Sequence, residues 1–286
     1  MAEIRAENLR HVYSAGTPFE KVAIDNINTI LHTGELIGII GHTGSGKSTF
    51  IQHLNALLKP TGGTVYCNEK DINADKFSRR DIKFQVGLVF QYPEYQLFEE
   101  TVYKDIAFGP KNMKLSDGEI DERVREAAGF VEVREELFDA SPLELSGGQK
   151  RRIAIAGVIA MRPGVLILDE PTAGLDPEGC RKILSNILDY RKKTGSTVVI
   201  VSHNMDDIAR MASRILVFDH GTLAMDGTPE EVFSQPEKLL SMGLDVPHVT
   251  ALAMEIRKQG IPLEGAIYTH EQLVSAVLKV KEAGGC

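Results

Sequence analysis

The sequence predicts an α/β protein with a mainly parallel core sheet, and three observations support this prediction. Short apolar runs recur along the chain, which is typical of strands that a parallel sheet buries on both faces. A glycine-rich loop directly follows the first of these runs. A polar, helix-rich segment from about residue 92 to 162 separates two of the runs and is too long for a simple crossover, which indicates an inserted helical subdomain.

The first forty residues predict an antiparallel sheet ahead of this core, because IRAENLRHVY and VAIDNINTIL alternate strand-like runs with polar turns. The predicted core strands are ELIGIIG (35–41), QVGLVFQ (85–91), VLILDEP (165–171) and STVVIVSH (196–203). Residues 214–227 predict a hairpin that turns at Asp219, His220 and Gly221.

The C-terminal part predicts short helices separated by glycine and proline. Thr228 is suited to cap a helix that begins at Pro229. The length of 286 residues fits one large domain with an appendage better than two full domains.

Composition narrows the function classes. The formal net charge of -8 opposes non-specific binding to nucleic acid, so we expect no nucleic-acid partner. Cys67, Cys180 and Cys286 have neither pairing nor metal-ligand spacing, which favours a reduced, cytosolic compartment. No stretch approaches the roughly 18 apolar residues of a spanning helix, and the N-terminus lacks the apolar run of a signal peptide. Any work at a membrane is therefore expected to depend on other subunits.

The string GHTGSGKS fits a phosphate-binding loop, with a strand before it and the helical run STFIQHLNALL after it. Backbone amides of such a loop wrap phosphates, Lys47 places a cation on the terminal ones, and the Ser48 hydroxyl is offered to magnesium. We assign no separate role to the His42 side chain. The predicted nucleotide-contacting loop residues are Gly41, His42, Thr43, Gly44, Ser45, Gly46, Lys47, Ser48 and Thr49.

The run VLILDE supplies two carboxylates at the end of a buried strand. Asp169 can hold magnesium directly or through water. Glu170 is suited to polarise the attacking water as a general base. A plain acidic pair that closes a strand is the structural alternative.

An ordered set of motifs identifies the family. In chain order these are GHTGSGKS, Gln91 at the end of QVGLVFQ, LSGGQ at 145–149, VLILDE, AGLD at 173–176, and His203 in VIVSH. On these motifs, residues 1–228 resemble an ATP-binding cassette (ABC) ATPase. The resemblance implies a P-loop NTPase fold with an N-terminal antiparallel β subdomain, a helical subdomain at about 92–162, and a short C-terminal helical extension at 229–286.

The resemblance also implies a head-to-tail dimer, in which the LSGGQ of one cassette closes over the γ-phosphate held by the other. Ser146 can cap the helix that follows, while the amides of Gly147 and Gly148 face the anion at its positive end. Gln149 completes the motif. Hydrolysis of ATP is then expected to depend on dimerisation.

Further roles follow only from the resemblance. Gln91 would reach magnesium or water and the transport partner, His203 would sense the γ-phosphate, and Asp176 would lie at the dimer seam. Tyr13 resembles the aromatic residue that stacks on adenine. The alternatives are a plain loop glutamine, a structural histidine and a packed strand tyrosine. We expect residues 150–152 (KRR) to form a solvated helix face.

Non-transport ABC proteins fit the sequence less well. Only 122 residues separate Lys47 from Asp169 (169 minus 47), so there is no room for the long coiled coil of a chromosome-maintenance ATPase. Translation-type and excision-type proteins normally carry two cassettes or zinc-binding cysteines. A transport motor is the strongest interpretation.

The segment at residues 91–110, QYPEYQLFEETVYKDIAFGP, is similar in sequence to the corresponding part of ATPases of energy-coupling factor (ECF) transporters, which import vitamins and transition-metal ions. We expect its apolar side chains to contact a membrane partner, although they could instead fill the helical subdomain; these are Tyr92, Tyr95, Leu97 and Phe98. SAGTPFEKVAIDNIN and GHTGSGKSTFIQHLNALLKPTGG resemble the A-prime type of ECF ATPase, which pairs with a related ATPase. The tail GLDVPHVTALAMEIRKQGIPLEG resembles the extension through which these ATPases associate.

Taken together, the resemblance implies ATP and Mg2+ as ligands and a peripheral place at the cytoplasmic face of the cell membrane. The implied partners are a second related ATPase, a transmembrane coupling protein and a substrate-binding membrane subunit. A conventional ABC importer and a dedicated cobalt or nickel uptake system remain alternatives, and a soluble ABC ATPase is a weaker one.

Overall fold

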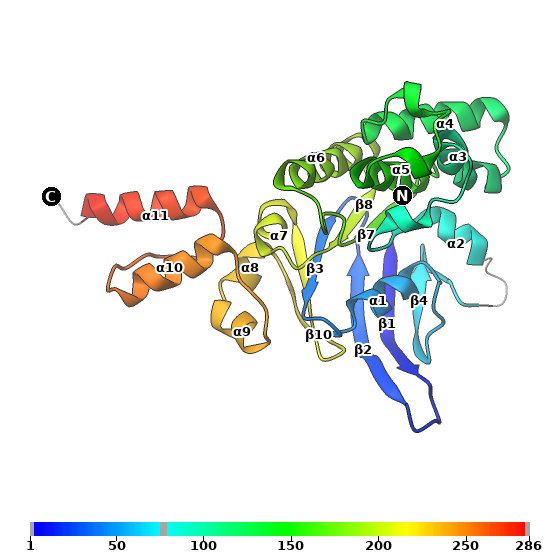
Figure 1. Cartoon of the computed structure of the whole chain (residues 1–286). Coiled ribbons are helices and arrows are strands. Elements are labelled where there is room, and N and C mark those ends of the chain that lie inside the picture. Colours follow the sequence, from blue (N-terminus) through cyan, green and yellow to red (C-terminus); the bar gives the residue numbers. More distant parts are fainter. Residues whose placement is uncertain (1–2, 75–78, 284–286) are drawn as a thin grey trace.

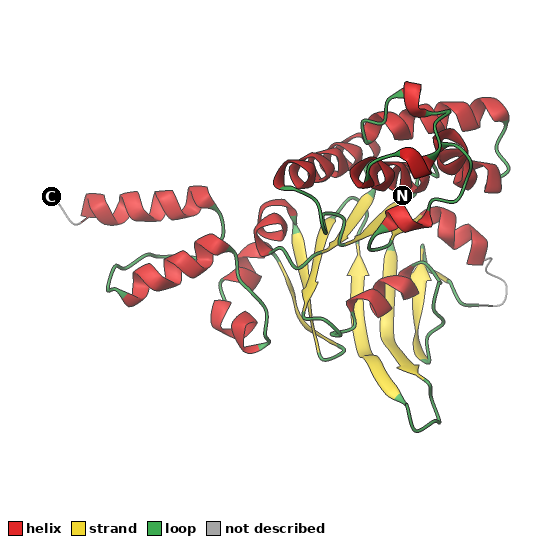
Figure 2. Ribbon diagram, viewed as in Figure 1, coloured by secondary structure: helices red, strands yellow, loops and turns green. Residues whose placement is uncertain are grey.

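The computed structural model describes residues 3–74 and 79–283, and within them the strands form two sheets (Figures 1 and 2). The core sheet has six strands. In spatial order they are β10 (Thr222–Gly227), β9 (Arg214–Asp219), β3 (Leu36–Gly41), β8 (Thr197–Val201), β7 (Val165–Asp169) and β6 (Val86–Val89). All neighbouring pairs are parallel except β9 with β10, which form the predicted hairpin. The predicted fold class is confirmed.

The core strands are buried on both faces, and alternate side chains enter two different hydrophobic clusters. In β7, Val165 and Ile167 join one cluster, whereas Leu166 and Leu168 join the other. This alternation follows from the period of two along a strand. Both faces therefore need a cover, which explains why the strands read as continuous apolar runs rather than as alternating ones.

The second sheet is antiparallel and covers one face of the core. Its spatial order is β2 (Lys21–Leu31), β1 (Ile4–Tyr13), β4 (Gly62–Cys67) and β5 (Lys70–Asp71). The sequence predicts the first two strands, but β4 and β5 were missed because they are short and contain few apolar residues. Helix α1 (Lys47–Leu54) lies between the sheets, where Phe50, Ile51 and Leu54 are fully buried.

Helices cover the other face of the core sheet (Figure 1). They are α3 (Val102–Asn112), α4 (Asp117–Phe130), α5 (Gly147–Ile159), α6 (Pro177–Thr194) and α7 (Met205–Met211). Helix α2 (Arg79–Gln85) precedes β6, and the short 3-10 turns are η1 (Pro93–Gln96), η2 (Glu135–Leu137) and η3 (Pro142–Glu144). Helices α3, α4 and α5 pack together and form the expected helical insertion between β6 and β7.

The C-terminal residues form α8 (Pro229–Phe233), α9 (Pro236–Ser241), α10 (His248–Lys258) and α11 (His270–Ala283). Thr228 caps α8 as predicted, in a reciprocal capping box with Glu231. Side chains of α8 and α9 join the main core, whereas α10 and α11 have a small cluster of their own and project from the body of the protein (Figure 1). Among the described residues, no helix combines the length and the apolar character that crossing a membrane requires.

Candidate functional site

The phosphate loop joins β3 to α1 in a conformation that requires glycine. Gly44 and Gly46 have φ angles of 82° and 105°, in the left-handed region that favours glycine. A Cβ atom at Gly46 would lie 2.6 Å from a methyl group of Ile24, and one at Gly41 would lie 2.5 Å from the carbonyl oxygen of Phe218. The loop is therefore fitted tightly between β2 of the antiparallel sheet and β9 of the core sheet. Its tip stays open, since no atom of residues 3–74 and 79–283 beyond the chain neighbours lies within 4 Å of the Cβ position at Gly44.

Lys47 is held inside this loop. Its Nζ donates to the carbonyl oxygens of Gly41 (2.6 Å) and His42 (3.0 Å). Burial lowers the pKa of Lys47, while the nearby carboxylates of Glu170 and Asp169 act in the opposite direction. The ammonium group thus lies beside both carboxylates and is positioned to exchange carbonyl oxygens for phosphate oxygens.

Ser48 and Asp169 meet at the edge where the parallel strands end. The Ser48 hydroxyl donates to Oδ2 of Asp169 at 3.3 Å. Burial raises the pKa of Asp169, and the neighbouring charge of Glu170 raises it further. A hydroxyl and a carboxylate are hard oxygen donors of the kind that Mg2+ prefers, so this pair fits the cation that the sequence implies.

Glu170 directly follows β7 and has a left-handed backbone, with φ of 51°. Such a conformation is uncommon for a residue with a side chain and is often found at functional sites. Its amide donates to the carbonyl oxygen of Val201 (2.9 Å), which holds it against the end of β8. This contact brings Glu170 next to the segment that carries His203.

Nδ1 of His203 lies 2.8 Å from Oε2 of Glu170. The two groups are close, but their orientation does not make a hydrogen bond, and Oε2 is buried without a hydrogen-bond partner among the described residues. An acceptor oxygen in this state is suited to receive a proton from a water molecule. The structure therefore places the predicted base and the predicted phosphate sensor side by side.

Tyr13 ends β1 beside the phosphate-loop helix. Its Oη lies 3.3 Å from Oγ1 of Thr49, and its ring packs edge-on against His11. Tyr13 is 41% exposed, so it is not a fully packed strand residue. Gln91 is exposed and lies two residues beyond the end of β6. The strand ends at Val89, whereas the sequence predicts that it extends to Gln91.

The LSGGQ segment opens α5 as predicted. The Ser146 hydroxyl accepts from the amide of Gln149 (3.4 Å), whose side-chain oxygen accepts from the Ser146 amide (3.0 Å). In the described part of the chain, no atom outside the helix's own backbone and the neighbouring residues lies within 4 Å of the Cβ position at Gly147 or Gly148. The first turn of the helix is therefore open at these two positions.

Asp176 caps α6, because its Oδ1 accepts from the amide of Gly179 at 2.7 Å. The family resemblance predicts that Asp176 lies at a dimer seam and does not predict the cap. The residue is exposed, so capping the helix leaves it accessible.

The prediction of a solvated helix face at residues 150–152 is wrong for Arg151. Residues 150–152 were expected to form a solvated face, but the Arg151 side chain is only 3% exposed. It forms a bidentate pair with Glu94 and also donates to the carbonyl oxygens of Pro171 and Ala173. No local pattern signals this role, because Glu94 lies 57 residues away in the sequence.

The aromatic side chains after Gln91 are largely on the surface. Tyr92, Tyr95 and Phe98 are 44%, 85% and 65% exposed, and Phe98 packs edge-on against the exposed ring of Phe108. They do not fill the interior of the helical layer, whereas Leu97 is partly buried against its core. The three aromatic residues therefore lie outside the core of the helical layer.

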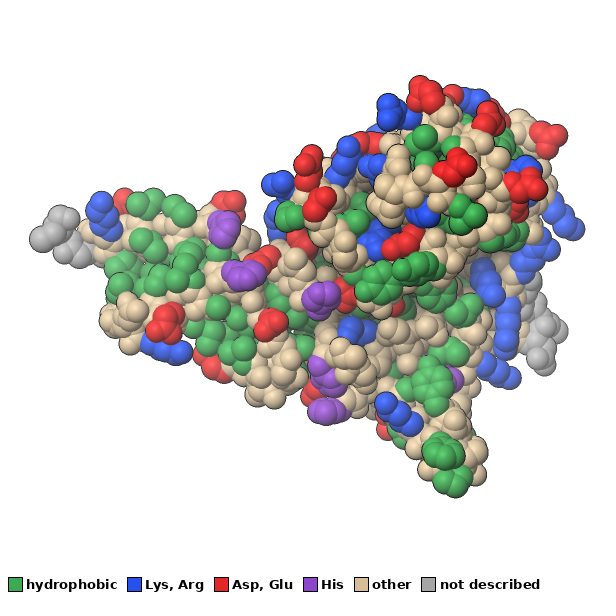
Figure 3. Space-filling model, viewed as in Figure 1, with side chains coloured by type: hydrophobic (Ala, Val, Ile, Leu, Met, Phe, Trp, Pro, Cys, Tyr) green, Lys and Arg blue, Asp and Glu red, His purple; other side chains and the backbone are tan. Residues whose placement is uncertain are grey.

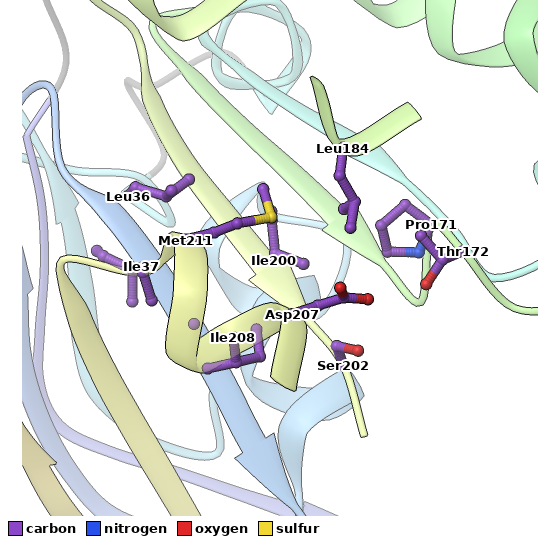
Figure 4. A pocket seen from close by; sticks show the side chains of 12 residues that line it. Leu36, Ile37, Pro171, Thr172, Leu184, Ile200, Ser202, Asp207, Ile208 and Met211 are labelled. Carbon is purple, nitrogen blue, oxygen red and sulfur yellow. The ribbon is translucent and has the colours of Figure 1, made fainter. Parts of the chain in front are cut away.

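A small, mostly apolar pocket lies between β3, β8 and α7 (Figure 4). Leu36, Ile200 and Met211 line it, and the side chain of Asp207 points into the same space. Burial raises the pKa of Asp207. No phosphate-loop residue lines this pocket, so it is separate from the nucleotide site.

The ABC transporter family profile matches residues 24–173. The chain belongs to the ABC transporter family, as its fold and its ordered motifs predict. Relatives described as energy-coupling factor transporter ATP-binding protein EcfA2 extend this similarity over nearly the whole chain. The relative from Caldanaerobacter subterraneus subsp. tengcongensis is 55% identical over 96% of both chains. That from Clostridium tetani is 52% identical over 97% of this chain and 96% of its own.

Solved structures of ABC proteins have the same fold as this chain. The structure described as cbiO1 from Clostridium perfringens, part of the ABC transporter complex cbiONQ, superposes with a TM-score of 0.74 at 38% identity, and covers 88% of this chain and 98% of its own. The ATP-binding cassette MJ0796, a dimer bound to ADP and Pi, superposes with a TM-score of 0.70 at 28% identity, over 79% and 98% of the two chains. The family predicted from the motifs is therefore confirmed.

Proposed function

We propose that this chain is the ATP-hydrolysing motor subunit of an ECF-type membrane importer for vitamins or transition-metal ions. The observation that carries the proposal is the convergence of Lys47, Ser48, Asp169, Glu170 and His203 at one edge of the core sheet. The curated relatives, which are named as energy-coupling factor transporter ATP-binding proteins, support the transport assignment.

Each of these residues has a separate role in the proposed hydrolysis of ATP. The amides of the phosphate loop and the Lys47 ammonium bind and orient the phosphates, and Tyr13 stacks on the adenine. Ser48, Asp169 and Gln91 would hold Mg2+, which supplies charge neutralisation at the phosphate oxygens. Glu170 takes the proton of the attacking water, and His203 keeps the Glu170 carboxylate and that water in place.

A second nucleotide-binding chain completes each site. The open end of α5, with Ser146, Gly147 and Gly148, is suited to the γ-phosphate held by a partner. Asp176 is also exposed and would lie at the seam between the two chains. A related but distinct ATPase is the proposed partner. In this arrangement neither chain alone hydrolyses ATP at a substantial rate.

Two apolar surfaces support the proposed assembly. The first consists of Tyr92, Tyr95 and Phe98, where a transmembrane coupling protein would dock. The second lies on the C-terminal helices, where Figure 3 shows hydrophobic side chains gathered on the surface. On α11, Val274 and Leu278 are 58% and 51% exposed. We assign residues 1–228 to the nucleotide-binding domain, and 229–286 to an extension that contacts the partner ATPase.

This assembly holds the chain at the cytoplasmic face of the membrane as a peripheral subunit. A substrate-binding membrane subunit completes it. That subunit would determine which substrate is transported. The residues of this chain discussed above are assigned to nucleotide and to partner chains, and none is assigned to the transported substrate.

A pull-down tests the proposal. Tagged Glu170→Gln chain is captured with ATP from detergent-solubilised membranes, and every retained protein is identified. The proposal expects a second related ATPase, a coupling protein and at least one small substrate-binding membrane protein. A pair of conventional permease subunits would replace the ECF assignment with a conventional importer, and recovery of soluble partners alone would overturn the transport role.

A matched pair of variants locates the ATPase contact. Val277 is 43% exposed on α11, so Val277→Glu is expected to reduce the yield of the second ATPase several-fold. Ser241→Glu introduces the same charge at an exposed polar position of α9, away from the apolar face of α11, and is expected to have little effect. Equal yields from both variants would exclude the apolar face of α11 as the contact.

A further inference from the structure

Two histidines and an aspartate meet where the phosphate loop touches the turn between β9 and β10. Each of His42, Asp219 and His220 offers a ligand atom, and these atoms all lie within 4.8 Å of one another. Within residues 3–74 and 79–283, no other group of three or more His, Cys, Asp or Glu side chains comes this close. Neither Asp219 nor His220 has a role in the nucleotide chemistry described above.

The separations match those of ligands on a small cation. Nε2 of His42 lies 3.2 Å from Oδ1 of Asp219, and Nε2 of His220 lies 3.7 Å from the same oxygen. Two ligands bound at about 2.0–2.2 Å to one tetrahedral ion are about 3.3–3.6 Å apart. The three side chains can therefore reach a shared ion with only small adjustments.

Two of the ligand atoms lack any other partner. Nε2 of His42 and Oδ1 of Asp219 are inaccessible to solvent and have no hydrogen-bond partner among the described residues, because their mutual orientation does not make a hydrogen bond despite the short distance. Buried polar atoms are rarely left in this state. A cation bound between them would satisfy both atoms at once.

The His42 ring is already oriented as a metal ligand. Its Nδ1 lies 2.9 Å from the carbonyl oxygen of Thr43, so this nitrogen is the donor in the neutral ring and Nε2 carries the lone pair. A backbone carbonyl on the second ring nitrogen is a common feature of metal-binding histidines.

The turn that carries the other two ligands is fixed to the phosphate loop. His220 and Gly221 have φ angles of 44° and 79°, which defines a tight two-residue hairpin turn. The amide of Gly221 donates to the carbonyl oxygen of Ser45 at 3.0 Å. The three ligands therefore belong to one rigid part of the protein.

We propose that His42, Asp219 and His220 form a binding site for a divalent transition-metal ion of the Zn2+, Co2+ or Ni2+ class. Two imidazole nitrogens and one carboxylate favour these ions over Mg2+ and Ca2+, which prefer oxygen ligands. The bound ion would connect the phosphate loop to the β9–β10 turn and so stabilise the folded chain. This inference does not depend on the transport function proposed above.

Cobalt binding tests the site. The full-length chain is titrated with Co2+ in excess Mg2+, and binding is followed by the visible absorption of the bound ion. The wild-type chain is expected to bind one equivalent through this site. His220→Asn is expected to weaken that binding roughly tenfold or more, while the turn is retained because Asn-Gly is favoured there. A thermal shift gives a second readout, since Zn2+ is expected to raise the melting temperature of the wild type but not of His220→Asn.

A matched control uses a histidine outside the cluster. His32 is exposed and lies 3.2 Å from a carboxylate oxygen of Glu3, but among the described residues it belongs to no group of three metal-ligating side chains. The variant His32→Asn is expected to bind Co2+ as the wild type does. Equal Co2+ affinity in the wild type and His220→Asn would overturn the proposal. The same holds if the wild-type chain binds no Co2+ even when Co2+ is added in excess over the protein.

Discussion

Glu94 and Arg151 form a bidentate ion pair, with distances of 2.8 Å from Oε1 to Nη2 and 3.1 Å from Oε2 to Nε. Glu94 lies in η1, three residues after Gln91, and Arg151 lies in α5 behind the LSGGQ motif. The same guanidinium donates to the carbonyl oxygens of Pro171 and Ala173, next to Glu170. The Arg151 side chain thus connects η1, helix α5 and the loop that follows Glu170.

Glu94→Gln is expected to destabilise the chain by about 3 kcal/mol, because it leaves the Arg151 charge buried without its counter-charge. Unfolding in urea measures the change. Adding Arg151→Met is expected to restore part of the loss, since the double variant has no unpaired charge. Glu100→Gln removes the exposed partner of Lys104 and serves as the control, with no expected change in the unfolding midpoint. A single variant as stable as the wild type would show that the pair contributes nothing.

Glu170→Gln is expected to lower ATP turnover by about 10²–10⁴-fold, because the amide cannot take a proton from water. Binding of ATP is expected to persist, since Lys47 and the phosphate loop are unchanged. Single-turnover hydrolysis and nucleotide affinity of the assembled ATPase pair give the two readouts. Glu178→Gln, in the exposed first turn of α6, is the control. Turnover at the wild-type rate would remove Glu170 from the role of base.

Gly147→Leu is expected to block hydrolysis at the partner's nucleotide while the chain keeps its own affinity for ATP. The added side chain has open space within this chain, so a loss of activity would reflect the approach of the partner's phosphates. Gly118→Leu is a matched control, because its Cβ position in α4 is equally open. Mixed dimers with one altered chain measure the effect site by site. Parallel loss of binding and hydrolysis in the altered chain would argue against a shared site.

The chain is expected to lose stability in mild acid through His53. This side chain is fully buried, and burial lowers its pKa from the ordinary 6.5 to about 4. The folded state therefore favours the neutral ring, so the stabilisation is complete above pH 6.5 and is lost as the pH falls toward 4. Between pH 7 and pH 5 the loss is about 2 kcal/mol.

Urea unfolding of the wild type and His53→Gln at both pH values measures this loss. The variant lacks the titrating ring, so its stability is expected to change less over the same range. His270→Gln changes an exposed histidine at the start of α11 and is expected to behave as the wild type. An equal pH dependence in the wild type and His53→Gln would exclude His53 as the source.

The sequence predicts the core strands and the order of the nucleotide-site motifs because these signals are local. Buried strands need continuous apolar residues, and a phosphate loop needs glycine at fixed spacing. Arg151 was placed wrongly because its burial depends on Glu94, which only the folded chain brings near. His42 carries no signal of its own for a similar reason, since Asp219 and His220 reach it through the β9–β10 turn.

The close fit of Gly46 against Ile24 has a consequence for nucleotide binding. Tyr13 on β1 and the phosphate loop contact the same antiparallel sheet, and β1 pairs with β2 along most of its length. The proposed base-binding residue and the phosphate loop are therefore preorganised relative to each other. A nucleotide that enters the site loses its own flexibility but does not have to order the protein as well, so more of its binding free energy would remain to draw together the two chains of the proposed ATPase pair.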